Sequence, residues 1–293
     1  MRIPRGTLAG FALLTSATLA LTGCTTSGKA DRPAAGAPAA TAAEPATDSL
    51  VKSTIQLSKG NYTYTMKGGA QSYEGVVHLP QSALLTVVDT SADGGEFAYL
   101  VVGKDRWVKL KMELDLGEDM PSPAELEQLA DQSPEIAKMA KQLKTLTAMV
   151  AGKKWLVIDP KRVDEFGEGF NGFEHPDATG ASYLLSTARS ATRAGDTITG
   201  DLDLSTVKAD QVPWDSEEVL DLKAAGKVPY AATLDGEGRL VKLVLDLPAM
   251  GEQKAHRETI EVTGYGAAAL QTKPATGDTI RMTDDMYDVL NGR

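Results

Sequence analysis

Apolar and polar residues alternate with the period of a β-strand in the first part of the chain. Tyr62, Tyr64 and Met66 share one side, and threonines stand between them. The same alternation continues over 73–79, 83–89, 96–102 and 105–111. With short connections between them, two of which are the turns Asp93-Gly94-Gly95 and Gly103-Lys104, these segments predict an antiparallel meander of five strands. The segment 96–102 is apolar on both sides. The predicted sheet therefore has more apolar surface than burial of a single face would require.

Other segments have the helical period. The strongest signal lies between Ile136 and Val150, where apolar residues recur at spacings of three and four. This stripe predicts a helical region from Pro121 to about Val150. Four further segments carry start or stop signals of helices. They are 48–57, 176–194, 215–225 and 284–290.

The last third of the chain returns to strands. After a short strand at 155–158, alternation resumes, and Asp235 to Gly238 forms a turn between two strand-like runs. The late predicted strands are 197–204, 228–234, 240–247 and 259–263. Roughly nine to eleven antiparallel strands with one dry face need a cover, which the helices can supply. We therefore predict an α+β fold, a curved antiparallel sheet in the form of a half-barrel with helices covering its concave face.

The first 23 residues are typical of a cleaved export signal. Two arginines precede an apolar stretch, from Thr7 to Thr22, that is too short to span a bilayer. The stretch ends in Leu21-Thr22-Gly23-Cys24, which resembles the bacterial lipobox. The resemblance implies that Cys24 receives a diacylglyceryl group and becomes the first residue of the mature chain. Two acyl chains make a stable anchor, so we expect a lipid-anchored protein on the extracytoplasmic side of the cell membrane.

A segment rich in Pro and Ala separates Cys24 from the predicted domain. Residues 24–47 show neither alternation nor a helical period, which predicts a solvated tether. Residues 48–293 are expected to form a single β-rich domain. The formal net charge of −10 and the lack of a basic stripe argue against a nucleic-acid partner. Cys24 is the only cysteine, so a disulfide within the chain is excluded.

No motif in the sequence supplies catalytic or metal-binding chemistry. The three histidines are far apart, without partners at ligand spacing, so we expect no metal site and no cofactor. A GxGxxG match at 167–172 lacks the strand and helix that a dinucleotide site needs. Two SxxK matches, at Ser49 and Ser205, lack their companion motifs. The acidic run from Glu113 to Asp119 lacks the spacing of a calcium loop. We expect a protein that is not an enzyme.

Two late segments resemble a known family. Residues 228–240 combine an extended strand, an acidic Gly turn and Arg-Leu, and residues 260–266 form a closing strand. With the lipobox, the tether and the order of elements, they resemble the LolA/LppX-type lipoproteins of actinobacteria, including the LprG group. The resemblance implies a half-barrel that binds acylated molecules between sheet and helices and carries them at the cell surface, without catalytic residues.

The expected function is binding or carriage of a hydrophobic, acylated ligand, a lipid or lipoglycan, at the outer face of the cytoplasmic membrane. We expect a monomer, held in the membrane by its diacylglyceryl cysteine. The residues expected to line the pocket are Tyr62, Tyr64, Val77, Leu79, Met139 and Leu143. The alternative is an extracellular sensor or interaction module that regulates a membrane-protein partner without lipid cargo.

Overall fold

A computed structural model describes most of the predicted domain. The described residues are 44–91, 94–113, 121–163, 173, 175–208, 211–212, 223–224, 226–249 and 254–291. The predicted export signal, Cys24 and most of the tether lie outside them. So do the GxGxxG match, the acidic run beyond Glu113 and most of the predicted helix 215–225.

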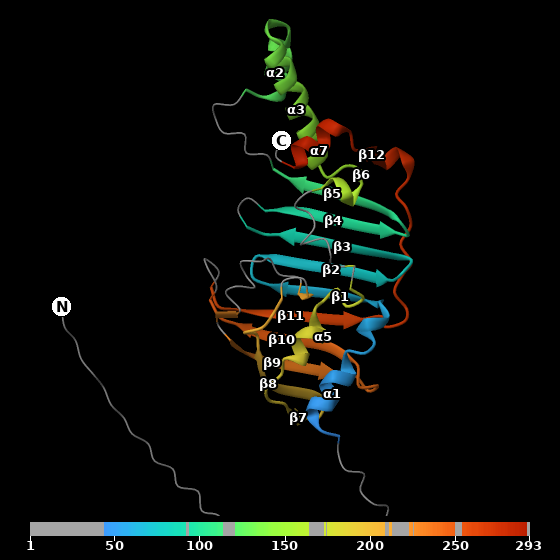
Figure 1. Ribbon diagram of the computed structural model, residues 1–293, viewed down its shortest axis with the longest axis vertical. Coiled ribbons are helices and arrows are strands. Elements are labelled where there is room, and N and C mark those ends of the chain that lie inside the picture. Colours follow the sequence, from blue (N-terminus) through green and yellow to red (C-terminus); the bar gives the residue numbers. More distant parts are fainter. Residues whose placement is uncertain are drawn as a thin grey trace, which may run out of the picture. The chain divides into compact units, whose positions relative to one another are not determined.

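One sheet of twelve strands runs through the described residues (Figure 1). Its strands are β1 (Asn61–Gly68), β2 (Gln71–His78), β3 (Ser82–Asp89), β4 (Gly95–Val102), β5 (Asp105–Met112), β6 (Trp155–Ile158), β7 (Thr192–Ala194), β8 (Thr197–Asp203), β9 (Lys227–Leu234), β10 (Leu240–Leu247), β11 (His256–Thr263) and β12 (Thr279–Arg281). Their order is β12-β6-β5-β4-β3-β2-β1-β11-β10-β9-β8-β7. Neighbours are antiparallel except β12 and β6, which are parallel.

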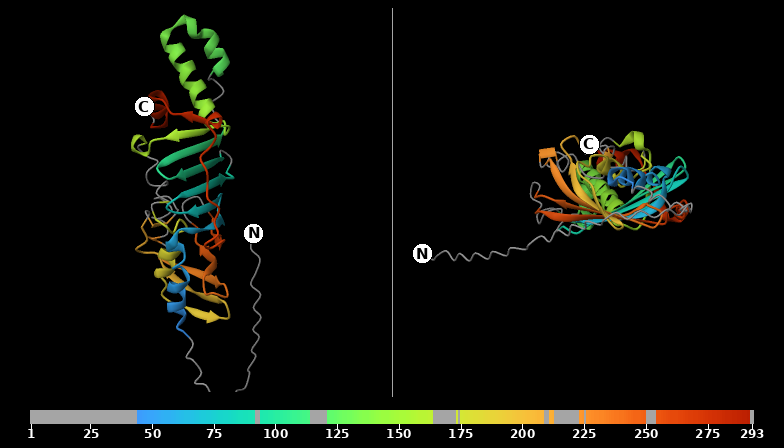
Figure 2. Two further views of the ribbon diagram at one scale, coloured as in Figure 1. Left: turned by 90° about the vertical axis from the view of Figure 1, so that its right-hand side faces the viewer. Right: turned by 90° about the horizontal axis from the view of Figure 1, so that it is seen from below.

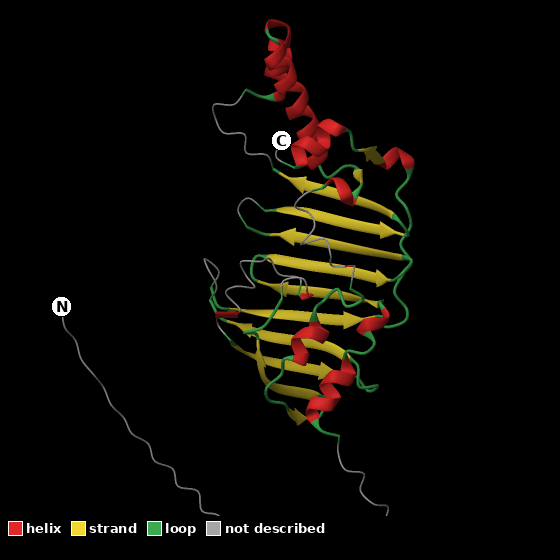
Figure 3. Cartoon of the chain, viewed as in Figure 1, coloured by secondary structure: helices red, strands yellow, loops and turns green. Residues whose placement is uncertain are grey.

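The helices are short, apart from one (Figure 3). The α-helices are α1 (Ala46–Ser53), α2 (Pro123–Leu129), α3 (Pro134–Val150), α5 (Ala181–Ser186) and α7 (Asp284–Leu290). Single 3₁₀ turns are η1 (Leu57–Lys59), η2 (Ala130–Gln132), η3 (Pro160–Arg162) and η6 (Thr276–Asp278). The predicted mid-chain helix is therefore interrupted, because the Ser133 side chain caps a new helix that Pro134 begins.

The predicted fold class is confirmed: the sheet is curved, mostly antiparallel and open at β12 and β7. In β1, Tyr62, Tyr64 and Met66 are buried, as the alternation predicted. We call the face of the sheet that carries these three side chains the inner face. The two strands that no predicted strand segment covers are β7 and β12, the three-residue edge strands, which are too short for alternation to reveal.

The predicted helix over 176–194 is wrong beyond its central part. Only Ala181–Ser186 is helical, and 192–194 forms β7, which pairs with β8. Gly195 adopts a left-handed φ of 62°, which turns the chain from β7 directly into β8. The strand prevails over the helix because it pairs backbone groups of β8 that would otherwise face outward.

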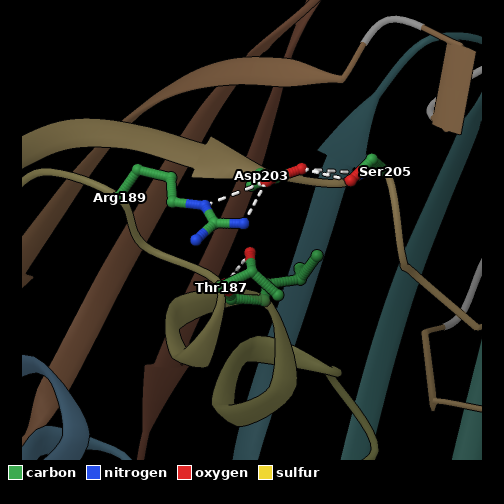
Figure 4. A network of polar contacts seen from close by, with 5 residues as sticks. Thr187, Arg189, Asp203 and Ser205 are labelled. Carbon is green, nitrogen blue, oxygen red and sulfur yellow. Dashed lines mark hydrogen bonds and ion pairs between the residues drawn. The ribbon is translucent and has the colours of Figure 1, made fainter.

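Arg189 and Asp203 hold the connection between α5 and β7 against β8 (Figure 4). The Asp203 carboxylate accepts hydrogen bonds from the Ser205 hydroxyl at 2.6 Å and from Arg189 Nε at 2.9 Å. The Asp203 N–H donates to the Thr187 carbonyl oxygen at 3.0 Å. The hydrogen bonds from Ser205 and Arg189 lower the pKa of Asp203 to about 2.

The largest hydrophobic cluster lies between two helices and the inner face of β1, β2 and β8–β11. Leu50 of α1 and Leu184 of α5 are 1% and 0% exposed within it. The right-hand view in Figure 2 shows the sheet curving, with α1 on its hollow side. Thus α1 and α5 cover this half of the inner face, and the buried apolar surface holds them there.

The mid-chain helices occupy a different place from the one we expected. α2 and α3 pack on each other, and α3 reaches β5 and α7 (Figure 1). Met149 and Val150, at the end of α3, join Leu156 of β6 and Met286 of α7 in a second cluster. The apolar stripe of α3 is therefore buried against α2 and against the β5–β6 end of the sheet. It does not cover the concave face, contrary to our expectation.

A long connection from β11 to β12 runs past the ends of the strands. The Ala268 N–H donates to Asn61 Oδ1 at 3.0 Å, and the Ala268 carbonyl oxygen accepts from His78 Nδ1 at 2.8 Å. The Gln271 N–H then donates to the fully buried Ser82 hydroxyl at 2.9 Å. These bonds fasten the connection to β1, β2 and β3.

Candidate functional site

The structure brings four of the six predicted pocket residues together. Tyr62, Tyr64 and Val77 belong to the large cluster and are 0%, 4% and 0% exposed. Leu79 is partly buried and packs against this cluster and a smaller one on β3–β5. These four residues therefore lie in or beside one hydrophobic cluster, to which residues of α5 also belong.

Met139 and Leu143 lie elsewhere, on α3. Met139 is 47% exposed, and Leu143 packs with Leu126 and Ala140 in a cluster between α2 and α3. The sequence placed them in the pocket because their stripe was expected to cover the sheet, and α3 packs on α2 instead. Cys24, the predicted lipidation site, lies outside the described residues.

Tyr62 acts as a clamp on the chain that leads into α5. Its hydroxyl donates to the Pro176 carbonyl oxygen at 2.9 Å and accepts from the Ala178 N–H at 2.7 Å. Burial raises the pKa of Tyr62, and also that of Tyr64, so both phenols stay neutral. The aromatic rings of the two residues lie 6.1 Å apart and tilted. Tyr62 thus positions the cover of the inner face.

Three cross-strand rows of the inner face run side by side over β2–β5. The first row contains Val77, Ala83 and Val101, which are at most 4% exposed. The second row contains Gly75, Leu85, Tyr99 and Val108, of which Leu85 is partly exposed. The third row contains Tyr73, Val87, Phe97 and Leu110, all partly exposed. Accessibility of the apolar face therefore increases along the strands from the first row to the third.

Phe173 covers part of this surface. Its ring is stacked on that of Tyr99, with the centroids 6.0 Å apart and the planes 13° from parallel. Phe173 also packs against both the large cluster and the β3–β5 cluster. It therefore lies where the half of the inner face under α1 and α5 meets the half formed by β3–β5.

A polar edge follows the third row. The Tyr73 hydroxyl donates to Gln71 Oε1, and Gln71 Nε2 donates to Asp89 Oδ2 at 3.3 Å. The Ser91 N–H also donates to Asp89 at 2.8 Å, and this hydrogen bond chiefly lowers the pKa of Asp89. The partly exposed apolar row thus borders a hydrogen-bonded polar edge that retains a charge at neutral pH.

Glu258 of β11 adds a buried carboxylate on the inner face. It is 4% exposed and lies across Gly68 of β1, where an added Cβ would come within 1.9 Å of Glu258 Oε2. Its alternation with Ile260 and Val262 in the sequence would have placed it on the inner face. Glu258 was missed because the predicted strand began one residue later, at Thr259.

The third row was also missed, although its signal was present. Phe97 and Val87 belong to predicted strands, and counting in steps of two from Tyr99 and Leu85 puts them on the inner face. Phe173 had no such signal. Its position depends on a fold-back of the chain that is fixed by the Tyr62 hydroxyl, a contact across 116 positions of sequence.

The described part of the chain lacks two kinds of feature. There, no group of three or more His, Cys, Asp or Glu side chains is arranged to hold a metal ion. No helix within the same ranges has the length and apolar character that crossing a membrane requires.

The fold is similar to two solved structures. One is the crystal structure of Mycobacterium tuberculosis lipoprotein LppX, with 16% identity over 78% of this chain and 100% of that chain and a TM-score of 0.34. The other is that of a LolA superfamily protein from Nitrosomonas europaea, with 13% identity over 79% of this chain and 96% of that chain and a TM-score of 0.24. Both bear family names that the sequence resemblance suggested. No family model and no curated protein matches the sequence.

Proposed function

We propose that this protein binds a hydrophobic, acylated ligand, a lipid or lipoglycan, on the inner face of β2–β5. The observation that carries the proposal is the third row, Tyr73, Val87, Phe97 and Leu110. Strands in a sheet lie about 4.8 Å apart, so four strands present an apolar row ~14 Å across. A contiguous apolar surface that remains accessible is typical of a binding site.

The polar edge supports an amphiphilic ligand. Gln71 and Asp89 lie one step along the strands from Tyr73 and Val87. A molecule whose acyl chain packs on the apolar rows would place its polar part at this edge, where hydrogen-bonding groups and water meet it. Burial of each methylene contributes about 0.8 kcal/mol, so the chain supplies the affinity and the edge orients the molecule.

The predicted pocket residues take different parts in this proposal. Leu79 and Tyr64 border the binding surface, Val77 forms its closed end, and Tyr62 positions the segment that covers it. Met139 and Leu143 take no part. The apolar lining and the neutral phenols favour binding over catalysis.

We further propose that Cys24 is acylated and anchors the protein at the outer face of the cytoplasmic membrane. The lipobox-like Leu21-Thr22-Gly23-Cys24 supports this. A flexible chain extends ~5–6 Å times the square root of its length. The predicted tether would therefore hold a monomeric domain ~25 Å from the anchor. The domain would meet lipids of that membrane without being inserted in it.

The test is mass spectrometry of an organic-solvent extract of the purified protein. We expect co-purifying acyl species in amounts comparable to the protein. The matched variant Val87→Asp, which places a charge in the third row, should carry much less. An extract free of acyl species, together with a co-isolated membrane protein, would contradict lipid binding and support the sensor function instead.

A further inference from the structure

Phe173 has an unusual place among the side chains that contact the β3–β5 half of the inner face. The hydrophobic cluster of this half consists of side chains from β3, β4 and β5, together with Leu79 in the turn after β2, Ile158 of β6, and Phe173. Among the described members of the cluster, Phe173 is thus the side chain that comes neither from a strand of the sheet nor from a turn of the meander. Its ring occupies surface on Tyr99 that the sheet alone would leave open.

The backbone shortly after Phe173 is firmly held. The Tyr62 hydroxyl is hydrogen-bonded to the backbone of Pro176 and Ala178. The Asp177 carboxylate accepts hydrogen bonds from the N–H groups of Thr179 and Ser182 at 3.0 and 2.7 Å. The start of α5 is therefore fixed to the sheet. Phe173 itself is held by its stacking on Tyr99 and by apolar packing against the two clusters.

Phe173 and Tyr99 differ in how easily they can move. Tyr99 lies in β4, which is hydrogen-bonded to β3 on one side and to β5 on the other. An acyl chain that packs in place of the ring buries apolar surface as Phe173 does. What is then lost is the additional attraction between the stacked rings, which the burial of a few further methylenes exceeds. A ligand that reaches the second row can therefore replace the Phe173 ring while leaving the sheet unchanged.

We propose that Phe173 occupies, in the unliganded protein, the part of the inner face on which an acyl chain packs, and that the ligand displaces it from Tyr99. This inference rests on the proposed function and adds its regulation: the side chain competes with the ligand. The site is kept covered when it is empty, and part of the binding energy is used to move Phe173.

The test compares three variants in the full chain, with cis-parinaric acid methyl ester as the fluorescent probe. Phe173→Ala removes the competing ring, so the affinity for the probe should rise about two- to tenfold, the range expected for one stacked aromatic pair. Phe173→Leu should give a smaller rise. Phe97→Ala removes part of the receiving surface and should lower the affinity.

The outcomes separate the two proposals. If the unaltered chain does not bind the probe, the proposed function fails. If it binds, but Phe173→Ala and Phe173→Leu bind equally well or more weakly, Phe173 is part of the binding surface or inert, and the inference is wrong. Should circular dichroism show that Phe173→Ala is unfolded, Phe173→Leu, which keeps an apolar side chain, decides the question.

Discussion

The hydroxyl of Tyr62 accepts the backbone N–H of Ala178 at 2.7 Å, although 116 positions separate the two residues in the sequence. The same hydroxyl donates to the Pro176 carbonyl oxygen. A single side chain of β1 thus satisfies two backbone groups of the segment that enters α5. The sheet and its cover are joined by this side chain as well as by apolar packing.

Tyr62→Phe should destabilise the protein. The change leaves the Ala178 N–H buried without its partner, which costs about 1–3 kcal/mol of unfolding free energy. Urea denaturation followed by circular dichroism measures this. Tyr64→Phe is the matched control, because it also removes a phenolic hydroxyl from a buried ring next to Tyr62. The Tyr64 hydroxyl forms no hydrogen bond among the described residues. An equal effect of both variants would contradict the clamp.

Gly75→Ala should also destabilise the sheet. Gly75 lies opposite Tyr64 in the register of β1 and β2, and an added Cβ would lie 1.9 Å from Tyr64 Cε1. Overpacking of this kind costs about 1–3 kcal/mol. Gly236→Ala, in the open turn between β9 and β10, meets no atom within 4 Å and should change stability by less than ~0.5 kcal/mol. Chemical denaturation of both variants tests the close approach of β2 to Tyr64.

Asp203 should make stability depend on pH in the acid range. Its pKa in the folded protein is about 2, below the ordinary value of 3.8. The charged form is thus favoured by folding, so its contribution is present above about pH 3.8 and is lost as the pH falls toward 2. Thermal unfolding between pH 2 and pH 6 should show this loss, and Asp203→Asn should reduce it. Asp196→Asn, at an exposed carboxylate beside the opposite end of β8, should leave it unchanged.

Met139→Glu should leave binding of an acyl probe unaltered. Met139 is 47% exposed on α3 and belongs to neither of the hydrophobic clusters on the inner face of β2–β5. Stability should change by less than ~0.5 kcal/mol, as is usual for an exposed site. Titration with cis-parinaric acid methyl ester checks the affinity. A large loss of affinity would return Met139 to the pocket in which the sequence placed it.

Much of the fold followed from local patterns in the sequence. The hairpin of β9 and β10 was predicted because two strand-like runs flank the acidic Gly turn from Asp235 to Gly238, and the predicted strand 155–158 coincides with β6. Such patterns report which side of a strand is buried. They work where burial on one face decides the choice of residues.

Long-range pairing could not be predicted in this way. β1 pairs with β11, so Thr63 lies beside Thr263, and no local signal identifies that partner. The same limit explains α3. Its apolar stripe showed that one side of the helix is buried, but it did not identify the partners, which are α2 and the β5–β6 end of the sheet. Met139 and Leu143 were assigned to the pocket for this reason, and Phe173 was overlooked.

The most direct test of ligand binding is photo-crosslinking with a diacylglycerol that carries a diazirine midway along one acyl chain. Peptide mapping should find the label on β3, β4 and β5, on peptides containing Val87, Phe97 and Leu110. Competition with unlabelled diacylglycerol should abolish it. Label confined to α2 and α3, or no label that unlabelled lipid can displace, would contradict a lipid site on the inner face.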